Sequence, residues 1–112
     1  MVLEQVDLLE EAGSDIIILL DHAQDWTTDP LAAEELRGID VIVQAGGTGF
    51  MVGEQDGVFN MIREGDMPSQ EHSYPVTQTD SEGNQVLIVN TEQLWKYIGH
   101  LMVEFDDEGM LL

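Results

Sequence analysis

Two short apolar runs that do not alternate with polar residues constrain the fold more than any other feature of the chain. Residues 15–20 read Asp-Ile-Ile-Ile-Leu-Leu, and residues 39–43 read Ile-Asp-Val-Ile-Val. Runs of this length, rich in β-branched residues, are typical of strands that are covered on both faces. Between them, Pro30 suits the first turn of a short helix over residues 29–37, and Gly38 suits its end. This order predicts two neighbouring parallel strands joined by a right-handed crossover.

The segment before the first run predicts another helix, and the whole chain predicts one domain. Apolar residues recur at helical spacing from Val2 to Ala12, and Gly13 can end the helix in a left-handed conformation. The chain has 112 residues, 43% of them apolar, which is enough for one hydrophobic core over residues 1–112. Because there is no cysteine, disulfide scaffolds and thiolate metal sites are excluded.

The second half of the chain predicts an antiparallel meander. Residues 74–79 and 85–90 flank the polar turn 80–84 and match the two strands of a hairpin. A third strand is expected over residues 95–105, with a bulge at Gly99. One face of this strand would carry Leu101, Val103 and Phe105. The complete pattern is an α/β fold of two βα units followed by the meander.

The charge of the chain limits its partners. The 23 acidic residues outnumber the three basic ones, which gives a formal net charge of −20. Such a surface repels phosphate backbones and anionic lipids, so we expect no nucleic-acid partner and no membrane partner. The acids are spread along the chain, a composition that fits either life at high salt or simple solubility.

Five segments, in order, resemble the C-terminal half of the catalytic domain of 5'-nucleotidases, which are calcineurin-like metallophosphoesterases. They are Asp15–His22, Gly38–Val43 with the glycine-rich turn after it, Tyr74-Pro75, Lys96–Leu101 and Phe105–Gly109. The resemblance implies a layered β-sandwich, in which two sheets pack face to face with helices outside. This chain would form about half of it.

The resemblance also implies a two-metal site that is degenerate here. In the family, divalent ions activate a water and polarise the phosphate. The motifs of the N-terminal half do not occur in this chain, and of the ligands expected from the C-terminal half only His22 matches. Gly46 and Thr48 stand where the family has two histidines. We therefore expect no metal cofactor in the isolated chain, and a two-metal site only if a missing half completes it.

Other candidate sites each have a simpler structural explanation. The glycine-rich turn over residues 46–49 lacks the lysine of a phosphate-binding loop, and a flexible turn explains it. The acidic turns 80–83 and 106–109 lack the alternating ligands of a calcium loop, and hairpin turns explain them. His72 and His100 have no metal-ligand spacing. Core packing is the commoner use of the aromatic and methionine residues Trp26, Trp95, Tyr97, Met51, Met61 and Met67, which could otherwise line a ligand pocket. The three methionines fall in an irregular stretch and could instead form an adaptable contact surface.

Apolar residues on both sides of the predicted strands indicate a partner. In the first strand, one face carries Ile16, Ile18 and Leu20, and the other carries Ile17 and Leu19. Residues 86–89 of the hairpin likewise place apolar side chains on both faces of their strand. The two short helices cannot cover all of these side chains. We expect either a homodimer or packing against a missing N-terminal half-domain.

Two functions from different classes remain open at this point. The chain is either a fragment of a 5'-nucleotidase-like phosphoesterase that is inactive alone, or a stand-alone, non-catalytic binding or assembly module derived from that fold. Residues 1–5 do not resemble a signal peptide. Complete family members are often periplasmic or extracellular.

The net charge predicts that salt stabilises the fold. Screening shortens the range of charge repulsion to about 3 Å at 1 M salt, and this relieves the compact state more than the unfolded one. The thermal unfolding midpoint should therefore be higher in about 2 M KCl than in about 0.1 M KCl. A midpoint that stays constant or falls would contradict a high-salt adaptation.

Overall fold

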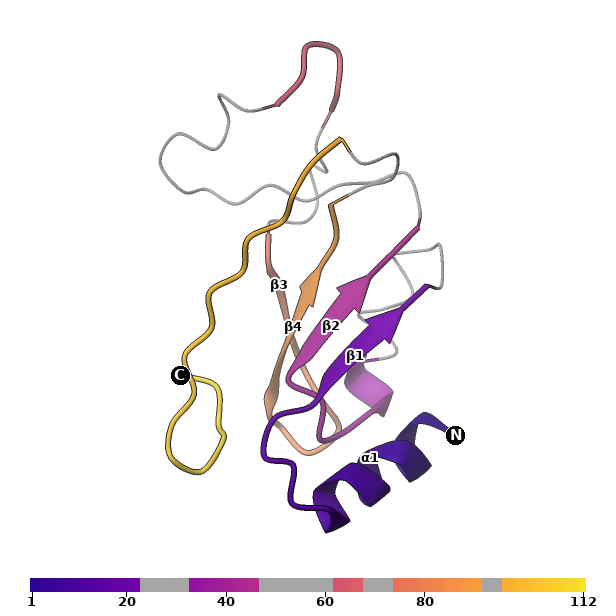
Figure 1. The fold of residues 1–112 in the computed structure, drawn as a ribbon, viewed down its shortest axis with the longest axis vertical. Helices are drawn as coiled ribbons and strands as arrows, with labels where there is room; N and C mark the ends of the chain where they lie inside the picture. Colours follow the sequence, from indigo (N-terminus) through magenta and orange to yellow (C-terminus); the bar gives the residue numbers. More distant parts are fainter. Residues whose placement is uncertain (23–32, 47–61, 68–73, 92–95) are drawn as a thin grey trace.

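The fold is a four-stranded sheet with helical segments on one face (Figure 1). The computed structural model describes residues 1–22, 33–46, 62–67, 74–91 and 96–112. Its elements are α1 (Val2–Glu11), β1 (Ile18–Asp21), β2 (Val41–Gln44), β3 (Val76–Thr79) and β4 (Gln85–Val89). Residues 33–35 are also helical, within the helix expected over residues 29–37. No helix in these described ranges is long and apolar enough to cross a membrane.

The strand order is β1-β2-β4-β3. β1, β2 and β4 run parallel, with Leu19 opposite Ile42 and Ile42 opposite Ile88, whereas β3 is antiparallel to β4. The parallel pair and the hairpin are confirmed. The hairpin does not begin a separate meander, because β4 joins the parallel strands and lies in the interior of the sheet. Its uninterrupted apolar run is explained by this interior position.

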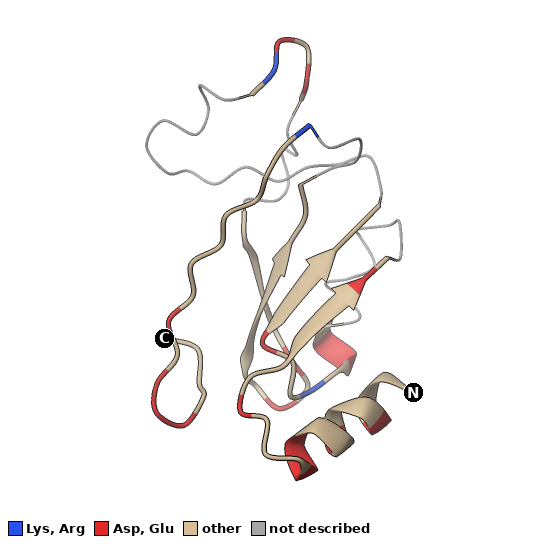
Figure 2. Ribbon diagram, viewed as in Figure 1, with Lys and Arg blue, Asp and Glu red and all other residues tan. Residues whose placement is uncertain are grey.

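Helix α1 ends where the glycine pattern predicts. Ala12 is the last αR residue, and Gly13 follows with φ of 88°. Val6 is the buried residue of the helix, and acidic residues lie along its exposed side (Figure 2). Gly38, with φ of 66°, lies against α1 so closely that a Cβ atom there would be 2.9 Å from Val6 Cγ1. A side chain at this position would therefore force the Glu10 and Val6 side chains to shift.

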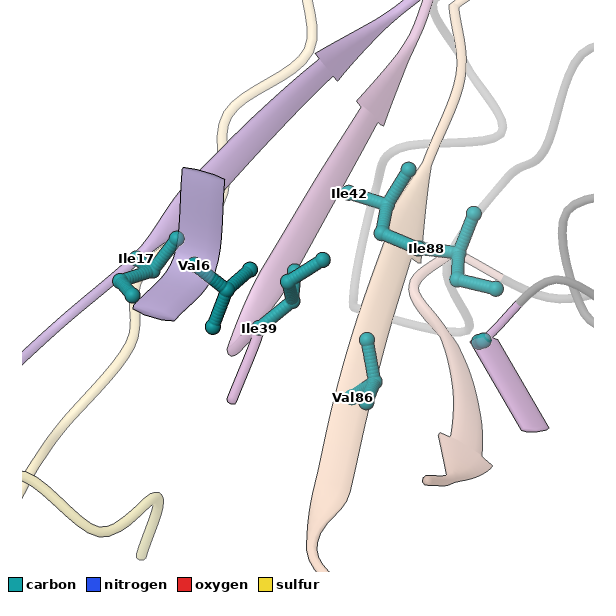
Figure 3. Packing of buried hydrophobic residues seen from close by; sticks show 7 residues of the cluster. Val6, Ile17, Ile39, Ile42, Val86 and Ile88 are labelled. Atoms are coloured by element: carbon teal, nitrogen blue, oxygen red, sulfur yellow. The ribbon is translucent and has the colours of Figure 1, made fainter. Parts of the chain in front are cut away.

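The hydrophobic core lies between one face of the sheet and these helical segments. Side chains from three neighbouring strands or their entries meet Val6 of α1 (Figure 3). The buried cluster consists of Val6, Ile17, Ala33, Ile39, Ile42, Val86 and Ile88. Ile42 and Ile88 are 1% and 0% exposed, and they lie opposite each other in the register of β2 and β4. This cluster holds α1 and the parallel strands together.

On the other face of the sheet, apolar side chains are exposed along β1 and at the end of β2. We call it the open face and define it by Ile16, Ile18, Leu20 and Val43, whose exposed fractions are 44%, 56%, 78% and 39%. Leu20 and Val43 lie opposite each other in the β1–β2 register. The expectation that both faces of the first strand are covered is therefore wrong. The expectation that the short helices cannot cover all of its apolar side chains is confirmed at this strand.

Farther along the same face, the hairpin is covered. Leu87 and Val89 are buried, so the expectation that one apolar face of this hairpin strand stays uncovered is wrong at β4. A hollow of about 460 Å³ lies between the hairpin and the C-terminal segment, with Leu87 on one side and Val103 and Leu111 on the other. The C-terminal segment therefore lies over the hairpin and leaves the open face uncovered.

The described C-terminal segment, residues 96–112, contains no strand, so the strand expected over 95–105 is not observed there. A single antiparallel bridge joins Phe105 to Leu111. Side-chain exposure nevertheless alternates, with Leu101, Val103 and Phe105 half-buried, as the shared apolar face predicts. Gly99 forms no strand bulge. It is packed instead so tightly that a Cβ atom would lie 2.6 Å from Thr91 Cγ2 and 2.9 Å from the Tyr74 hydroxyl.

The difference between the two faces predicts different costs for similar truncations. Ile42→Ala removes atoms from the closed core and should lower the free energy of unfolding by about 2–5 kcal/mol. Leu20→Ala on the open face should change it by less than about 0.5 kcal/mol. Urea unfolding of both variants and the parent chain measures the difference. Equal losses would show that the open face is covered in solution.

Candidate functional site

Two residues that the sequence singled out, His22 and Gly46, lie at the carboxyl edge of the parallel strands, together with Asn90. His22 directly follows β1, Gly46 lies two residues beyond β2, and Asn90 directly follows β4 (Figure 1). Because these strands are parallel neighbours, their carboxyl ends meet at one edge of the sheet. This is the edge at which open α/β sheets bind ligands.

A buried pair of amide side chains occupies this edge. Gln44 and Asn90 are 4% and 3% exposed, and Asn90 Nδ2 donates to Gln44 Oε1 at 2.6 Å. The same nitrogen donates to the carbonyl oxygen of Gly46 at 3.2 Å. Gly46 has φ of 84°, a left-handed conformation that favours glycine. The amide pair therefore fixes the turn at Gly46, the position to which the resemblance assigns a histidine of the family.

Neither residue of this pair was predicted as a site residue, although the sequence contains a signal for it. Gln44 and Asn90 are the polar residues that end two successive apolar runs. Because burial of an amide requires hydrogen-bond partners, two such residues at adjacent strand ends are expected to bond to each other. Gln44 Nε2 is buried without a partner, which leaves this donor unsatisfied.

The structure brings together only part of the expected metal-ligand set. His22 is exposed, Gly46 has no side chain to contribute, and Thr48 lies outside the described residues. Within the described ranges, no three His, Asp or Glu side chains are arranged to hold a metal ion. His100 is exposed as expected, and His72, Trp26, Trp95, Met51 and Met61 lie outside the described residues. Met67 is exposed, which fits the alternative of a contact surface and not core packing.

A second polar cluster joins residues 62–67 to the start of the C-terminal segment. The Tyr97 hydroxyl donates to Asp66 Oδ2 at 2.7 Å and accepts from the Arg63 amide at 3.0 Å. Lys96 Nζ lies 3.4 Å from Asp66 Oδ1. The hydrogen bond from Tyr97, followed by the charge of Lys96, lowers the pKa of Asp66. Two of the three basic residues of the chain therefore lie here (Figure 2).

The acidic turns have the hairpin geometry that the sequence predicts. Asp80 Oδ1 accepts hydrogen bonds from the amides of Glu82 and Asn84, at 2.9 Å and 2.8 Å. Asp106 Oδ1 accepts from the amides of Glu108 and Met110 in the same way, at 3.0 Å and 2.8 Å. In both turns one aspartate oxygen closes the turn, so this atom is not free to bind a ligand.

Comparison with known proteins identifies the class of fold. The structure superposes on the NAD nucleotidase of Haemophilus influenzae with a TM-score of 0.73 and 26% identity, over 99% of this chain and 20% of that one. It superposes on a 5'-nucleotidase precursor from Thermus thermophilus with a TM-score of 0.67 and 25% identity, over the same shares of the two chains. The sheet and its flanking helices are therefore those of the metallophosphoesterase fold.

Sequence comparison gives the family. The chain is 32% identical over 111 residues to the 5'-nucleotidase of Mus musculus, covering 96% of this chain and 17% of that protein. It is 30% identical over 112 residues to the snake venom 5'-nucleotidase of Naja atra, covering 97% and 19%. No family model matches the chain. It is a relative of the 5'-nucleotidases and spans less than a fifth of the length of these two proteins.

The loss of ligands predicts weak metal binding at this edge. A divalent ion needs several convergent ligands, and one exposed histidine does not provide them. Titration of the isolated chain with Zn²⁺ or Mn²⁺ should therefore give no tight binding that depends on His22. His22→Ala and the control His100→Ala should behave alike. Tight binding that only His22→Ala abolishes would contradict this prediction.

Proposed function

We propose that this chain is the C-terminal part of a 5'-nucleotidase-like phosphoesterase domain, and that it takes part in hydrolysis of nucleotide phosphate esters only after the rest of such a domain packs against it. The observation that supports this proposal is the open face. It is a bare apolar sheet surface in a chain that matches less than a fifth of the length of its relatives.

The physical basis is the free energy of burial. Covering a leucine or isoleucine side chain contributes about 1.5–3 kcal/mol relative to leaving it in water. The open face has three such side chains on β1 and just before it, each more than two-fifths exposed, and Val43 on the neighbouring strand β2. A second sheet packed against this face would bury them together, as in a sandwich.

The same proposal limits the chemistry that the completed domain can perform. His22 is the one expected ligand that this chain retains, and it lies exposed at the carboxyl edge of β1. The turn at Gly46 is held by a hydrogen bond from Asn90 Nδ2 to the Gly46 carbonyl oxygen. We therefore expect the completed domain to hold its metals less tightly than a domain with both histidines.

A non-catalytic role is the second candidate, and the amide pair favours it. The hydrogen bond between Asn90 and Gln44 connects the ends of β4 and β2 through neutral side chains, at the edge where the resemblance would place metal ligands. In this role the open face would bind a second copy of the chain, as a homodimer, or another protein.

Complementation tests the catalytic proposal. The chain would be mixed with the preceding part of the catalytic domain of a 5'-nucleotidase relative, and Mn²⁺-dependent hydrolysis of a nucleoside monophosphate would be measured. The chain alone should show no activity above background, and the mixture should show some. Gly46→His combined with Thr48→His should increase that activity by supplying the absent imidazoles.

Two charge substitutions serve as a matched pair for the docking surface. Leu20→Asp on the open face should abolish complementation, whereas Leu8→Asp on the exposed side of α1 should not. A complex without activity would support the non-catalytic role. If light scattering instead shows a stable dimer that Leu20→Asp dissociates, a second copy covers the open face. A monomer that binds neither partner would contradict both roles.

A further inference from the structure

One stretch of the C-terminal segment has the side-chain pattern of a strand but no strand beside it. Residues 98–103 read Ile-Gly-His-Leu-Met-Val and contain no acidic side chain, in a chain with 23 acidic residues. Leu101 and Val103 are half-buried, whereas Ile98, His100 and Met102 are exposed. Alternation with a period of two is typical of a strand with one covered face. We call residues 98–103 the unpaired stretch.

The main chain of this stretch has no hydrogen-bond partner. Within the described part of the chain, none of the amide and carbonyl groups of residues 98–103 makes a hydrogen bond. The next carbonyl along the chain, that of Glu104, accepts from the Leu112 amide at 3.0 Å. A row of unpaired main-chain groups in an extended segment is a template on which another strand can pair.

The unpaired stretch is held in place near both of its ends. At its start, Gly99 packs so closely that a Cβ atom would lie 2.6 Å from Thr91 Cγ2. Beyond its end, Gly109 packs so closely that a Cβ atom would lie 2.6 Å from the Asp15 carbonyl oxygen. Because its position is already fixed, pairing with another strand would cost less conformational entropy than ordering a free peptide.

This stretch forms part of a second layer over the sheet. Figure 1 shows the C-terminal segment passing beside the hairpin, and Met102 and Val103 line the hollow that separates it from Leu87. Leu87 of β4 is opposite Val41 of β2, which lies on the same face as Val43 because residues two apart in a strand share a face. The hairpin surface under the unpaired stretch and the open face are therefore neighbouring parts of one face of the sheet.

A strand paired with the unpaired stretch would extend this second layer over the open face. Neighbouring strands lie about 4.8 Å apart in any sheet, so strands added on the side of β2 would lie above β2 and then β1. Two sheets stacked in this way pack about 10 Å apart and bury the side chains between them. The same added strands would therefore satisfy the main chain of residues 98–103 and cover Val43 and Leu20.

We propose that the unpaired stretch is one strand of a second sheet, and that the rest of the phosphoesterase domain docks on this chain by pairing a strand with residues 98–103. This inference rests on the proposed function and adds to it the main-chain contact by which the two parts assemble. The partner is the rest of the domain and not a second copy, because two chains with a formal net charge of −20 repel each other.

The proposal also explains a difference between sequence and structure. The sequence predicts a strand over residues 95–105, and the described residues 96–112 contain none. A strand is defined by its ladder of main-chain hydrogen bonds, so a segment with the correct side-chain pattern forms one only when a second strand lies beside it.

Amide hydrogen exchange tests the pairing residue by residue. The ¹⁵N-labelled chain would be measured alone and in complex with the preceding part of the catalytic domain of a 5'-nucleotidase relative. Alone, the amides of residues 98–103 should exchange almost as fast as those of an unstructured peptide. In the complex, at least every second amide should exchange about a hundredfold more slowly, because successive amides of a strand point to opposite edges.

Proline substitutions separate main-chain pairing from side-chain contact. Met102→Pro and Val103→Pro each remove one amide hydrogen, and these two amides point to opposite edges. One of the two should weaken the complex about tenfold or more relative to its control, Met102→Ala or Val103→Ala. The isolated proline and alanine variants should have similar thermal midpoints, since no hydrogen bond is lost. His100→Pro or Leu101→Pro replaces a variant that does not fold, because amides two apart share an edge.

The outcomes distinguish this proposal from the proposed function. An active complex in which residues 98–103 stay unprotected would overturn the pairing and leave the phosphoesterase role intact. A protected but inactive complex would support the pairing and contradict the catalytic role. Protection already present in the isolated chain would overturn the proposal, and a dimer in light scattering would then identify a second copy as the partner. Two parts that do not associate, or two proline variants that bind like their alanine controls, would also overturn it.

Discussion

The fold depends on the contact between Ile42 and Ile88 at the centre of the sheet. These two side chains are opposite each other on neighbouring parallel strands, and both are almost completely buried. Val6 of α1 packs into the same cluster, together with Ile17 and Ile39 from the entries of the strands. Parallel strands are stable only when helices or other elements cover them, so this one-sided core leaves the opposite face to be covered by something else. The open face is a direct consequence of that requirement.

Polar groups are placed at the two ends of this sheet. At the carboxyl edge, the Gln44–Asn90 pair holds the turn at Gly46 with neutral hydrogen bonds. At the amino edge, Asp40 and Asp80 are among the residues that line a cavity, and Arg37 pairs with Glu10 and Glu82 of the same lining. The carboxyl edge thus carries a neutral amide pair beside Asp21 of β1, whereas several carboxylates line the cavity at the amino edge.

The sequence predicted the elements whose signals are local. The glycine after α1, the apolar runs of β1 and β2 and the turn between β3 and β4 all form from neighbouring residues, and each was found within a few positions. The resemblance to 5'-nucleotidases was also correct, because five ordered segments carry it. The place of β4 between β2 and β3 was not predicted, since strand order depends on contacts between residues far apart in the chain. For the same reason the covering of Leu87 by the C-terminal segment was missed.

The candidate site was predicted less completely than the fold. His22 and Gly46 were placed at the correct edge, because residues that follow parallel strands share an edge whatever the strand order. The amide pair and the Asp66–Tyr97 contact could not be obtained from spacing alone, because each joins residues more than 30 positions apart.

The central claim is that the open face is a packing surface for the rest of a phosphoesterase domain. The chain has no cysteine, so Leu20→Cys introduces a single thiol on this face, and Leu8→Cys introduces one on the exposed side of α1. The reaction rate of each thiol with a labelling reagent would be measured with and without the preceding part of a 5'-nucleotidase domain. The thiol at position 20 should react freely in the isolated chain and become protected on assembly, while the thiol at position 8 stays reactive. A thiol at position 20 that is already protected in a monomer, or that stays reactive in the assembled domain, would contradict the claim.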